Sequence, residues 1–292
     1  MTAHSEKNNG TIYVVLAALL FSLGGLMVKL VPWSGLSING ARNVIAMIII
    51  GLYLKKTHHC IIINRAVLFG ALCLAGTTTL YCMANKLTTA ANTIVLQFTA
   101  PAFVIFFNYL FFRKKPAKMD LFACLAMFAG ILFFFIDSLS AGNLLGDILA
   151  ILSGVCYAGV FMMNSFKTSD SMSSIFLGQL ISAVGCIWFV AGETDFGPAA
   201  IAGILILGIF QLALAYIFMA KGLETTPPVT ASLTSAIEPV LNPVLVAVFY
   251  HEMISGTAFI GAVIVIISVV TYNILQTRAA ESLNSTDASG EE

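Results

Sequence analysis

The stretch Ser232-Leu-Thr-Ser-Ala-Ile-Glu-Pro239 lies inside a long apolar segment and has a counterpart 138 positions earlier, Ile94-Val-Leu-Gln-Phe-Thr-Ala-Pro101. Aligned without a gap, the two segments also pair Thr88 with Thr226 and Phe111 with Phe249. They differ where Ala100 of the first copy becomes Glu238 of the second. We therefore expect one apolar unit used twice, with an acid in only one copy.

The composition indicates a membrane protein. The chain is 59% hydrophobic and 10% charged, with a mean hydropathy of +0.96. A soluble protein of this length needs more charge than this to cover its surface. The apolar runs approach the length of about 20 residues that a helix needs to cross about 30 Å of hydrocarbon. The short alternating strands of a membrane barrel are absent, so the sequence predicts an all-α membrane fold.

Ten apolar segments are long enough to cross the membrane as helices. They cover residues 11–31, 36–54, 66–84, 92–112, 119–137, 147–164, 172–192, 199–219, 229–250 and 256–276. The first segment is too long for a signal peptide and has little positive charge before it, so we expect it to be retained.

The distribution of Lys and Arg predicts the orientation, because cytoplasmic loops carry an excess of these residues. With both termini in the cytoplasm, the outer loops hold only Lys29 and Lys86, while Arg42 lies within the second span. The other eleven basic residues then face inward: Lys7, Lys55, Lys56, Arg65, Arg113, Lys114, Lys115, Lys118, Lys167, Lys221 and Arg278.

The two halves match along most of their length at offsets of 136 to 138 positions: Phe21 aligns with Tyr157, and Arg42 with Gln179. Five spans is an odd number, so the second half is predicted to insert upside down, as in the inverted repeats of many secondary transporters. The expected organisation is a cytoplasmic segment 1–10, a first repeat 11–137, an external linker 138–146, a second repeat 147–276 and a disordered cytoplasmic tail 277–292.

These residues resemble the drug/metabolite transporter superfamily, specifically its ten-helix EamA family, over roughly residues 10–276. The resemblance rests on Arg42, on the segment 84–101 and on Glu238-Pro-Val-Leu-Asn-Pro243. Where relatives often show Gly-Glu, the first repeat has Arg113-Lys114, and only Glu252 supplies the acid in the second. The resemblance implies a central cavity lined by helices one, three, four, six, eight and nine, about which the two halves rock.

Glu238 is the leading candidate for a functional side chain, because it is the one acid well inside a span. An intramembrane carboxylate is costly unless it faces a cavity or a partner. Glu238 would serve as a proton-coupling site, as a counter-charge for a cationic substrate or as a hydrogen-bond anchor. The alternative is a protonated, structural Glu beside the helix break. Ser235, Glu238 and Asn242 share one helical face.

Further polar and aromatic side chains are expected to line a substrate pocket, with helix glue and ordinary packing as the alternatives. These candidates are Phe21, Thr78, Tyr81, Gln97, Tyr157, Gln211 and Tyr216. On span four, Asn108 shares a face with Gln97. Three prolines, Pro101, Pro239 and Pro243, are predicted to kink the helices and free backbone carbonyls. Arg42 would either gate the pathway with a carboxylate or extend to the outer surface.

The predicted function is secondary active transport of a small metabolite, an amino acid or a related amine, across the cytoplasmic membrane by alternating access. Import of a quaternary amine such as choline is the alternative, and a channel or an intramembrane enzyme is disfavoured. No GxxxxGK[ST] motif is present, and neither cysteine nor histidine spacing indicates a metal or a cofactor. Expected partners are the solute, membrane lipid and protons, with no nucleic acid, in a monomer or a homodimer.

Overall fold

The computed structural model describes residues 2–137, 139, 143–241 and 255–289, and every regular element within these ranges is a helix. The elements are α1 (Thr2–Phe21), α2 (Gly24–Leu30), α3 (Gly35–Lys56), α4 (Arg65–Leu87), α5 (Ala90–Gln97), α6 (Ala100–Phe112), α7 (Lys118–Phe135), α8 (Leu144–Phe161), α9 (Ser171–Cys186), η1 (Ile187–Gly192), α10 (Pro198–Ile206), η2 (Leu207–Leu214), α11 (Ala215–Thr225), α12 (Pro228–Thr234) and α14 (Gly256–Ser289). The predicted all-α fold is confirmed for these residues.

Eight helices of the described chain are long and apolar enough to cross a membrane, and Gly10–Phe21 is a shorter apolar helix. These segments fall on nine of the ten predicted spans. The remaining segment is the ninth predicted span, 229–250, which extends into the range 242–254. Asn242, Pro243 and Glu252 therefore lie outside the described residues. The number ten therefore stays a prediction.

The outer surface of the bundle is apolar, as expected of helices that contact lipid. Phe122 on α7 and Trp188 on η1 are each 76% exposed. Many other large apolar side chains on the periphery are also exposed, including Leu72, Leu125, Leu144 and Phe259. Soluble monomers rarely expose so many large apolar side chains together.

Two predicted spans are broken near their middles rather than simply kinked. Span four ends as α5 at Gln97 and resumes as α6 at Ala100, which places Pro101 in the first turn of α6. Span nine ends as α12 at Thr234, and helical structure resumes over residues 237–241. Proline has no N–H to continue the ladder and is well accepted in a first turn, so each break lies just before its proline.

Two further spans depart from regular α-helix at the same depth. Span one is interrupted between α1 and α2, and span eight contains the π-helical segment η2. The widened turns of π-helical segments are frequent at functional sites. The breaks in spans one, four and nine and the η2 segment all contribute residues to one cavity.

The basic loops gather at one end of the bundle, which we call the basic end. Here the loop after α3 contacts the segment before α9: His59 Nε2 lies 3.0 Å from Asp170 Oδ2, and Asn64 Nδ2 donates to Thr168 O. Asp170 also caps α9 through the Ser173 N–H at 2.7 Å. Burial raises the pKa of the Asp170 carboxyl, but the hydrogen bonds from Ser173 and His59 outweigh it and hold that pKa below its ordinary value.

A matching contact closes the opposite end. The loop after η1 reaches the start of α3, where Ser34 N–H donates to Glu193 Oε1 at 2.8 Å and Trp33 Nε1 donates to Asp195 O. Ser34 caps α3 as Asp170 caps α9. The antiparallel helices α3 and α9 are thus joined at both ends of the molecule.

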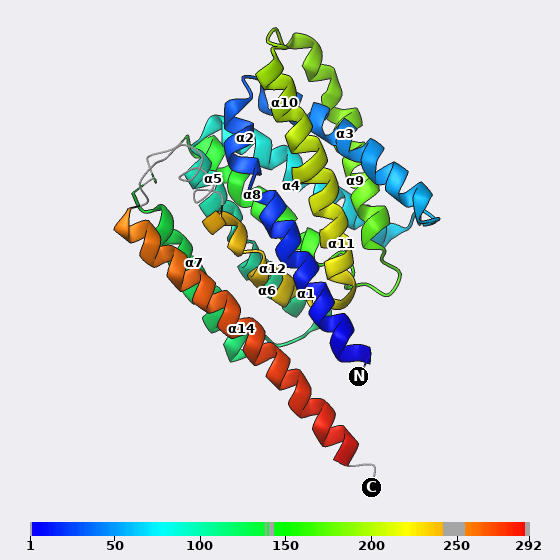
Figure 1. Ribbon diagram of the computed structural model, residues 1–292, viewed down its shortest axis with the longest axis vertical. Coiled ribbons are helices and arrows are strands. Elements are labelled where there is room, and N and C mark those ends of the chain that lie inside the picture. The colour runs from blue at the N-terminus through cyan, green and yellow to red at the C-terminus, as the bar shows by residue number, and fades with distance from the viewer. Residues whose placement is uncertain (1, 138, 140–142, 242–254, 290–292) are drawn as a thin grey trace.

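α7 and α14 lie side by side along one edge of the molecule (Figure 1). Tyr272 of α14 donates to Asp120 Oδ1 near the start of α7 at 2.7 Å. The start of α1 and the end of α14 lie at the same end of the molecule (Figure 1). The sequence predicts a disordered tail from residue 277, whereas α14 continues to Ser289. Ala, Arg, Glu and Leu in this segment favour helix and extend one already formed.

Candidate functional site

A small cavity lies between the broken helices, at the level of the breaks. Its volume is about 30 Å³, room for little more than a water molecule. Spans one, two, three, four, six, eight and nine contribute its lining residues, which are Phe21, Arg42, Thr77, Thr78, Tyr81, Gln97, Tyr157, Gln211, Leu212, Tyr216 and Glu238. We call it the central cavity.

Arg42 of α3 is 1% exposed, so it does not extend to the outer surface, which was one of its two expected roles. Its guanidinium donates to Gln211 Oε1 at 3.0 Å, to Thr78 O at 3.1 Å and to Asn39 Oδ1 at 3.3 Å. Its Nε has no partner among the described residues. No described carboxylate forms an ion pair with Arg42, so its positive charge is left available to the cavity.

At the first helix break, the side chain of Gln97 is hydrogen-bonded within the protein. Gln97 Nε2 donates to Ser153 Oγ at 2.9 Å, and Ser153 Oγ donates to Thr77 O at 3.1 Å. The chain of bonds joins α5, α8 and α4. Gly154 of α8 lies against the break, because a Cβ there would be 2.7 Å from the Gln97 carbonyl oxygen. The absence of a side chain at residue 154 lets α8 approach this freed carbonyl.

The second break carries polar atoms that the described protein leaves unpaired. Glu238 lies in the first turn of the helical segment 237–241, and its N–H donates to Ser235 O. Its carboxyl contacts the Tyr157 hydroxyl, whereas its Oε2 is buried without a partner among the described residues. Ser235 Oγ is likewise buried: the Tyr157 hydroxyl is nearby, but no hydrogen bond of normal geometry joins Ser235 Oγ to the described chain. Buried polar atoms are rarely left unpaired, so unpaired ones indicate water or a ligand.

Aromatic rings surround Glu238 on the side of spans one, six and eight. Phe21 contacts Tyr216 edge to face with ring centroids 4.8 Å apart, and it contacts Tyr157 at 6.5 Å. Phe98, at the first break, contacts Tyr157 from the other side at 6.4 Å. These rings make the wall of the cavity next to the carboxyl apolar in body and electron-rich in face, a surface that suits an ammonium group.

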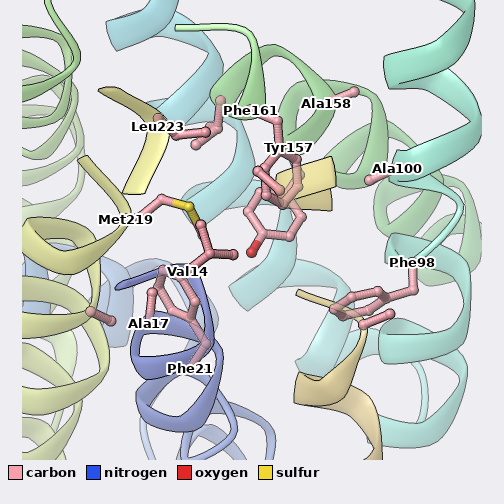
Figure 2. Close-up of a cluster of buried hydrophobic side chains, with 14 of the residues drawn as sticks. Val14, Ala17, Phe21, Phe98, Ala100, Tyr157, Ala158, Phe161, Met219 and Leu223 are labelled. Carbon is pink, nitrogen blue, oxygen red and sulfur yellow. The ribbon is translucent and has the colours of Figure 1, made fainter. Parts of the chain in front are cut away.

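Toward the basic end, an apolar layer closes the central cavity. The layer consists of Val14 on α1, Phe161 on α8, and Met219 and Leu223 on α11, each at most 4% exposed. The rings of Phe161 and Tyr157 are 4.6 Å apart, and Figure 2 shows Leu223, Met219 and Val14 grouped with them. On each of α1, α8 and α11, a residue of the apolar layer lies one to two turns closer to the basic end than the residue that lines the central cavity.

The structure brings most of the predicted site residues together. Nine of them line the central cavity: Phe21, Arg42, Thr78, Tyr81, Gln97, Tyr157, Gln211, Tyr216 and Glu238. Ser235 is buried at the second break beside it, and Pro101 and Pro239 lie buried just after the two breaks. Asn242 and Pro243 lie outside the described residues. Sequence reasoning missed Leu212 and the structural partners Asn39 and Ser153.

Within the described ranges, no group of three or more His, Cys, Asp or Glu residues is arranged so that it could hold a metal ion. The six cysteines are free and dispersed. The chemistry of the cavity is instead that of recognition: one guanidinium, one carboxyl, two amides, hydroxyls and aromatic rings.

Comparisons with known proteins agree on the class. The sequence model of the EamA-like transporter family matches residues 8–136 and again residues 144–274. An uncharacterized transporter of Clostridium kluyveri is 24% identical over 294 residues, which cover 90% of this chain and 93% of that protein. A solved crystal structure superposes with a TM-score of 0.79 at 16% identity, covering 92% of this chain and 98% of the other, and supports the fold alone.

Proposed function

Because the chain belongs to the EamA-like transporter family, we propose that it is a secondary transporter that moves a small zwitterionic metabolite of the amino-acid class. Family membership makes it a multi-pass membrane transport protein. The single observation that carries the substrate proposal is the meeting of Arg42 and Glu238 in the lining of one cavity.

The paired charges favour a solute that carries both a carboxylate and an ammonium. Arg42 keeps an unpaired Nε–H and no carboxylate partner in the described chain, so it supports binding of a carboxylate. Glu238, with an unpaired oxygen and the rings of Phe21, Tyr157 and Tyr216 nearby, supports binding of an ammonium. Each charge then finds a partner on the solute, which offsets the cost of burying it.

A quaternary amine such as choline is the second candidate, favoured by the same aromatic wall. Arg42 argues against it, because a cationic solute in the cavity would face an uncompensated guanidinium. A zwitterion avoids this repulsion. Comparing the binding of zwitterions with that of quaternary amines therefore tests the proposed role of Arg42 as well as that of Glu238.

The proposed mechanism is alternating access between two inverted repeats in the cytoplasmic membrane, with the basic end in the cytoplasm. Two separate matches to one family model support the division into repeats. The breaks at Gln97 and Thr234 and the caps at Ser34 and Asp170 recur at offsets of 136 to 137 positions. Ligand pockets usually enclose about 300–1,000 Å³, so a cavity of 30 Å³ has to widen before a solute enters.

Glu238 is also the proposed proton-coupling group. A carboxyl that exchanges its interaction with Tyr157 for one with a solute ammonium changes its surroundings as the solute arrives. The sequence has no nucleotide-binding motif, so the energy source is a gradient of protons or of the solute itself.

Counterflow in liposomes tests this function. Purified protein, reconstituted with an internal pool of unlabelled amino acid, is expected to accumulate the labelled amino acid with saturable kinetics, as a carrier does. Glu238→Gln is expected to slow this exchange and to change its pH dependence. Exchange that survives Glu238→Gln with the same rate and pH dependence rules out the role of Glu238, and an unsaturable flux rules out a carrier.

A further inference from the structure

A second, larger cavity lies at the basic end, beyond the apolar layer. Its volume is about 390 Å³, large enough for a small metabolite, whereas the central cavity is about 30 Å³. Phe161 and Leu223 form its buried floor, and Lys114 and Glu224 lie exposed at its mouth. We call this space the vestibule. The apolar layer therefore separates two cavities that lie one behind the other.

The lining of the vestibule repeats the chemistry of the central cavity. It offers one ammonium at Lys114, one carboxylate at Glu224 and an amide at Asn108. On span four, Gln97 lines the central cavity and Asn108 lines the vestibule. The span therefore contributes one amide to each cavity, and its buried residues between them, Pro101, Val104 and Ile105, are apolar.

Two buried hydroxyls of the vestibule have no hydrogen-bond partner among the described residues: Thr226 Oγ1 and Ser165 Oγ. Thr226 is 4% exposed, and its Oγ1 lies against α1, where a Cβ on Gly10 would be 2.7 Å away, so a solute reaches this hydroxyl only when α1 moves. A buried hydroxyl without a partner carries an energetic penalty that a bound solute or water removes. The nearby Asn164, in contrast, is fully engaged with Ser171, accepting from its N–H at 3.0 Å and donating to its Oγ at 3.2 Å.

We infer that the vestibule is a second binding site for the transported zwitterion. Asn108 and Thr226 hold the solute between Lys114 and Glu224 before it moves past Phe161 into the central cavity. The inference rests on the proposed function, because it assigns the same solute class to both cavities. The two sites differ in the face of the membrane from which the solute reaches them. The central cavity serves transport in both directions, whereas the vestibule serves only solute that arrives at the basic end.

Thr226→Val tests the site, because valine keeps the shape of threonine and removes the hydroxyl. Since this hydroxyl has no protein partner in the described chain, its loss should leave the melting temperature unchanged or raise it. The half-saturating concentration at the basic-end face should rise about 3- to 10-fold, which corresponds to one hydrogen bond. The maximal rate and the half-saturating concentration at the opposite face should stay unchanged. Asn108→Leu should give the same one-faced effect.

Thr230→Val is the matched control. Thr230 is also buried, lies one turn beyond Thr226 and accepts from Gln276 Nε2 at 3.4 Å, but it does not line the vestibule. The probe is an equimolar mixture of radiolabelled amino acids, applied to each face of proteoliposomes with uniformly oriented protein. Thr230→Val should leave the half-saturating concentrations at both faces unchanged.

The outcomes separate the two proposals. If the unaltered protein moves none of the mixture, the proposed function and the vestibule site both fall. If it transports but Thr226→Val and Asn108→Leu match Thr230→Val, or change both faces equally, the vestibule site alone falls. A zwitterionic lipid headgroup has the same chemistry as the solute, so liposomes with and without phosphatidylethanolamine are compared. A one-faced effect that requires this lipid overturns the inference.

Discussion

The two broken helices share the same kind of backbone interruption but differ in how the polar side chains beside it are bonded. Both spans stop just before a proline and resume within three residues. At the first break, Ala100 is fully buried and Gln97 is held by Ser153. At the second break, Glu238 and Ser235 carry buried oxygens that the described residues leave unpaired. The two breaks therefore differ in how their buried polar side chains are bonded, and the proposed function places the solute at the second break.

Placing an acid in the first break should have the largest effect. Ala100→Glu places a carboxyl at a position that is 0% exposed, at a cost of about 3 kcal/mol. Ala100→Gln has nearly the same size and serves as the control for steric crowding alone. Thermal unfolding in detergent measures both. The comparison fails if Ala100→Glu is as stable as Ala100→Gln and transports normally.

Removing the acid from the second break should leave the fold intact and weaken binding. Glu238→Gln keeps the size and the contact with Tyr157 but loses the charge that we propose binds the solute ammonium. Loss of one partner from a buried charge pair costs about 2–5 kcal/mol, or about 30-fold or more in affinity. Binding measured by isothermal titration, beside thermal unfolding, checks both parts. A large drop in melting temperature with unchanged affinity would instead assign Glu238 a structural role.

The hydrogen bonds of the first break should matter for stability more than for binding. Ser153→Ala leaves the Gln97 amide without its partner and removes the additional bond to the Thr77 carbonyl of α4, which should lower the free energy of unfolding by about 1–3 kcal/mol. Ser232→Ala is the control, since buried Ser232 bonds only to Val229 O in its own helix. An equal loss of stability in both variants would show that the link between α5, α8 and α4 contributes nothing special.

The smallest effect is expected from the hydroxyl of the second break. Ser235→Ala removes a buried hydroxyl without a partner in the described chain, so the melting temperature should stay unchanged or rise slightly. Affinity for the solute should fall by up to about tenfold, the value of one hydrogen bond. Destabilisation as large as that of Ser153→Ala would mean that Ser235 is held by the protein after all, and the two breaks would then be alike.

Much of the central cavity could be predicted from the sequence, because polar side chains at helical spacing in apolar spans face a cavity or another helix and not lipid. Arg42, Gln97 and Glu238 meet where that reasoning puts them. Their partners could not be predicted, since the bond from Gln97 to Ser153 joins positions 56 residues apart through tertiary packing. The extent of the helix breaks was also hidden, because proline predicts a lost hydrogen bond and not the length of the interruption.

The continuation of α14 beyond residue 277 shows the limit of polarity as a guide to disorder. The segment is polar, and its composition predicts a disordered tail. Its Ala, Arg, Glu and Leu residues are nevertheless strong helix formers, and a preceding helix removes the cost of nucleation. Polarity in this segment therefore does not mark the end of the helix.

The most direct test of the central claim compares three solutes that share one side chain: an amino acid, its decarboxylated amine and its deaminated acid. Thermal stabilisation by each reports its affinity. The unaltered protein should be stabilised most by the amino acid, Glu238→Gln should lose its preference for the amino acid over the acid, and Arg42→Gln should lose its preference over the amine. Equal stabilisation by the amine and the amino acid, unchanged in Arg42→Gln, would contradict the account and identify a cation site.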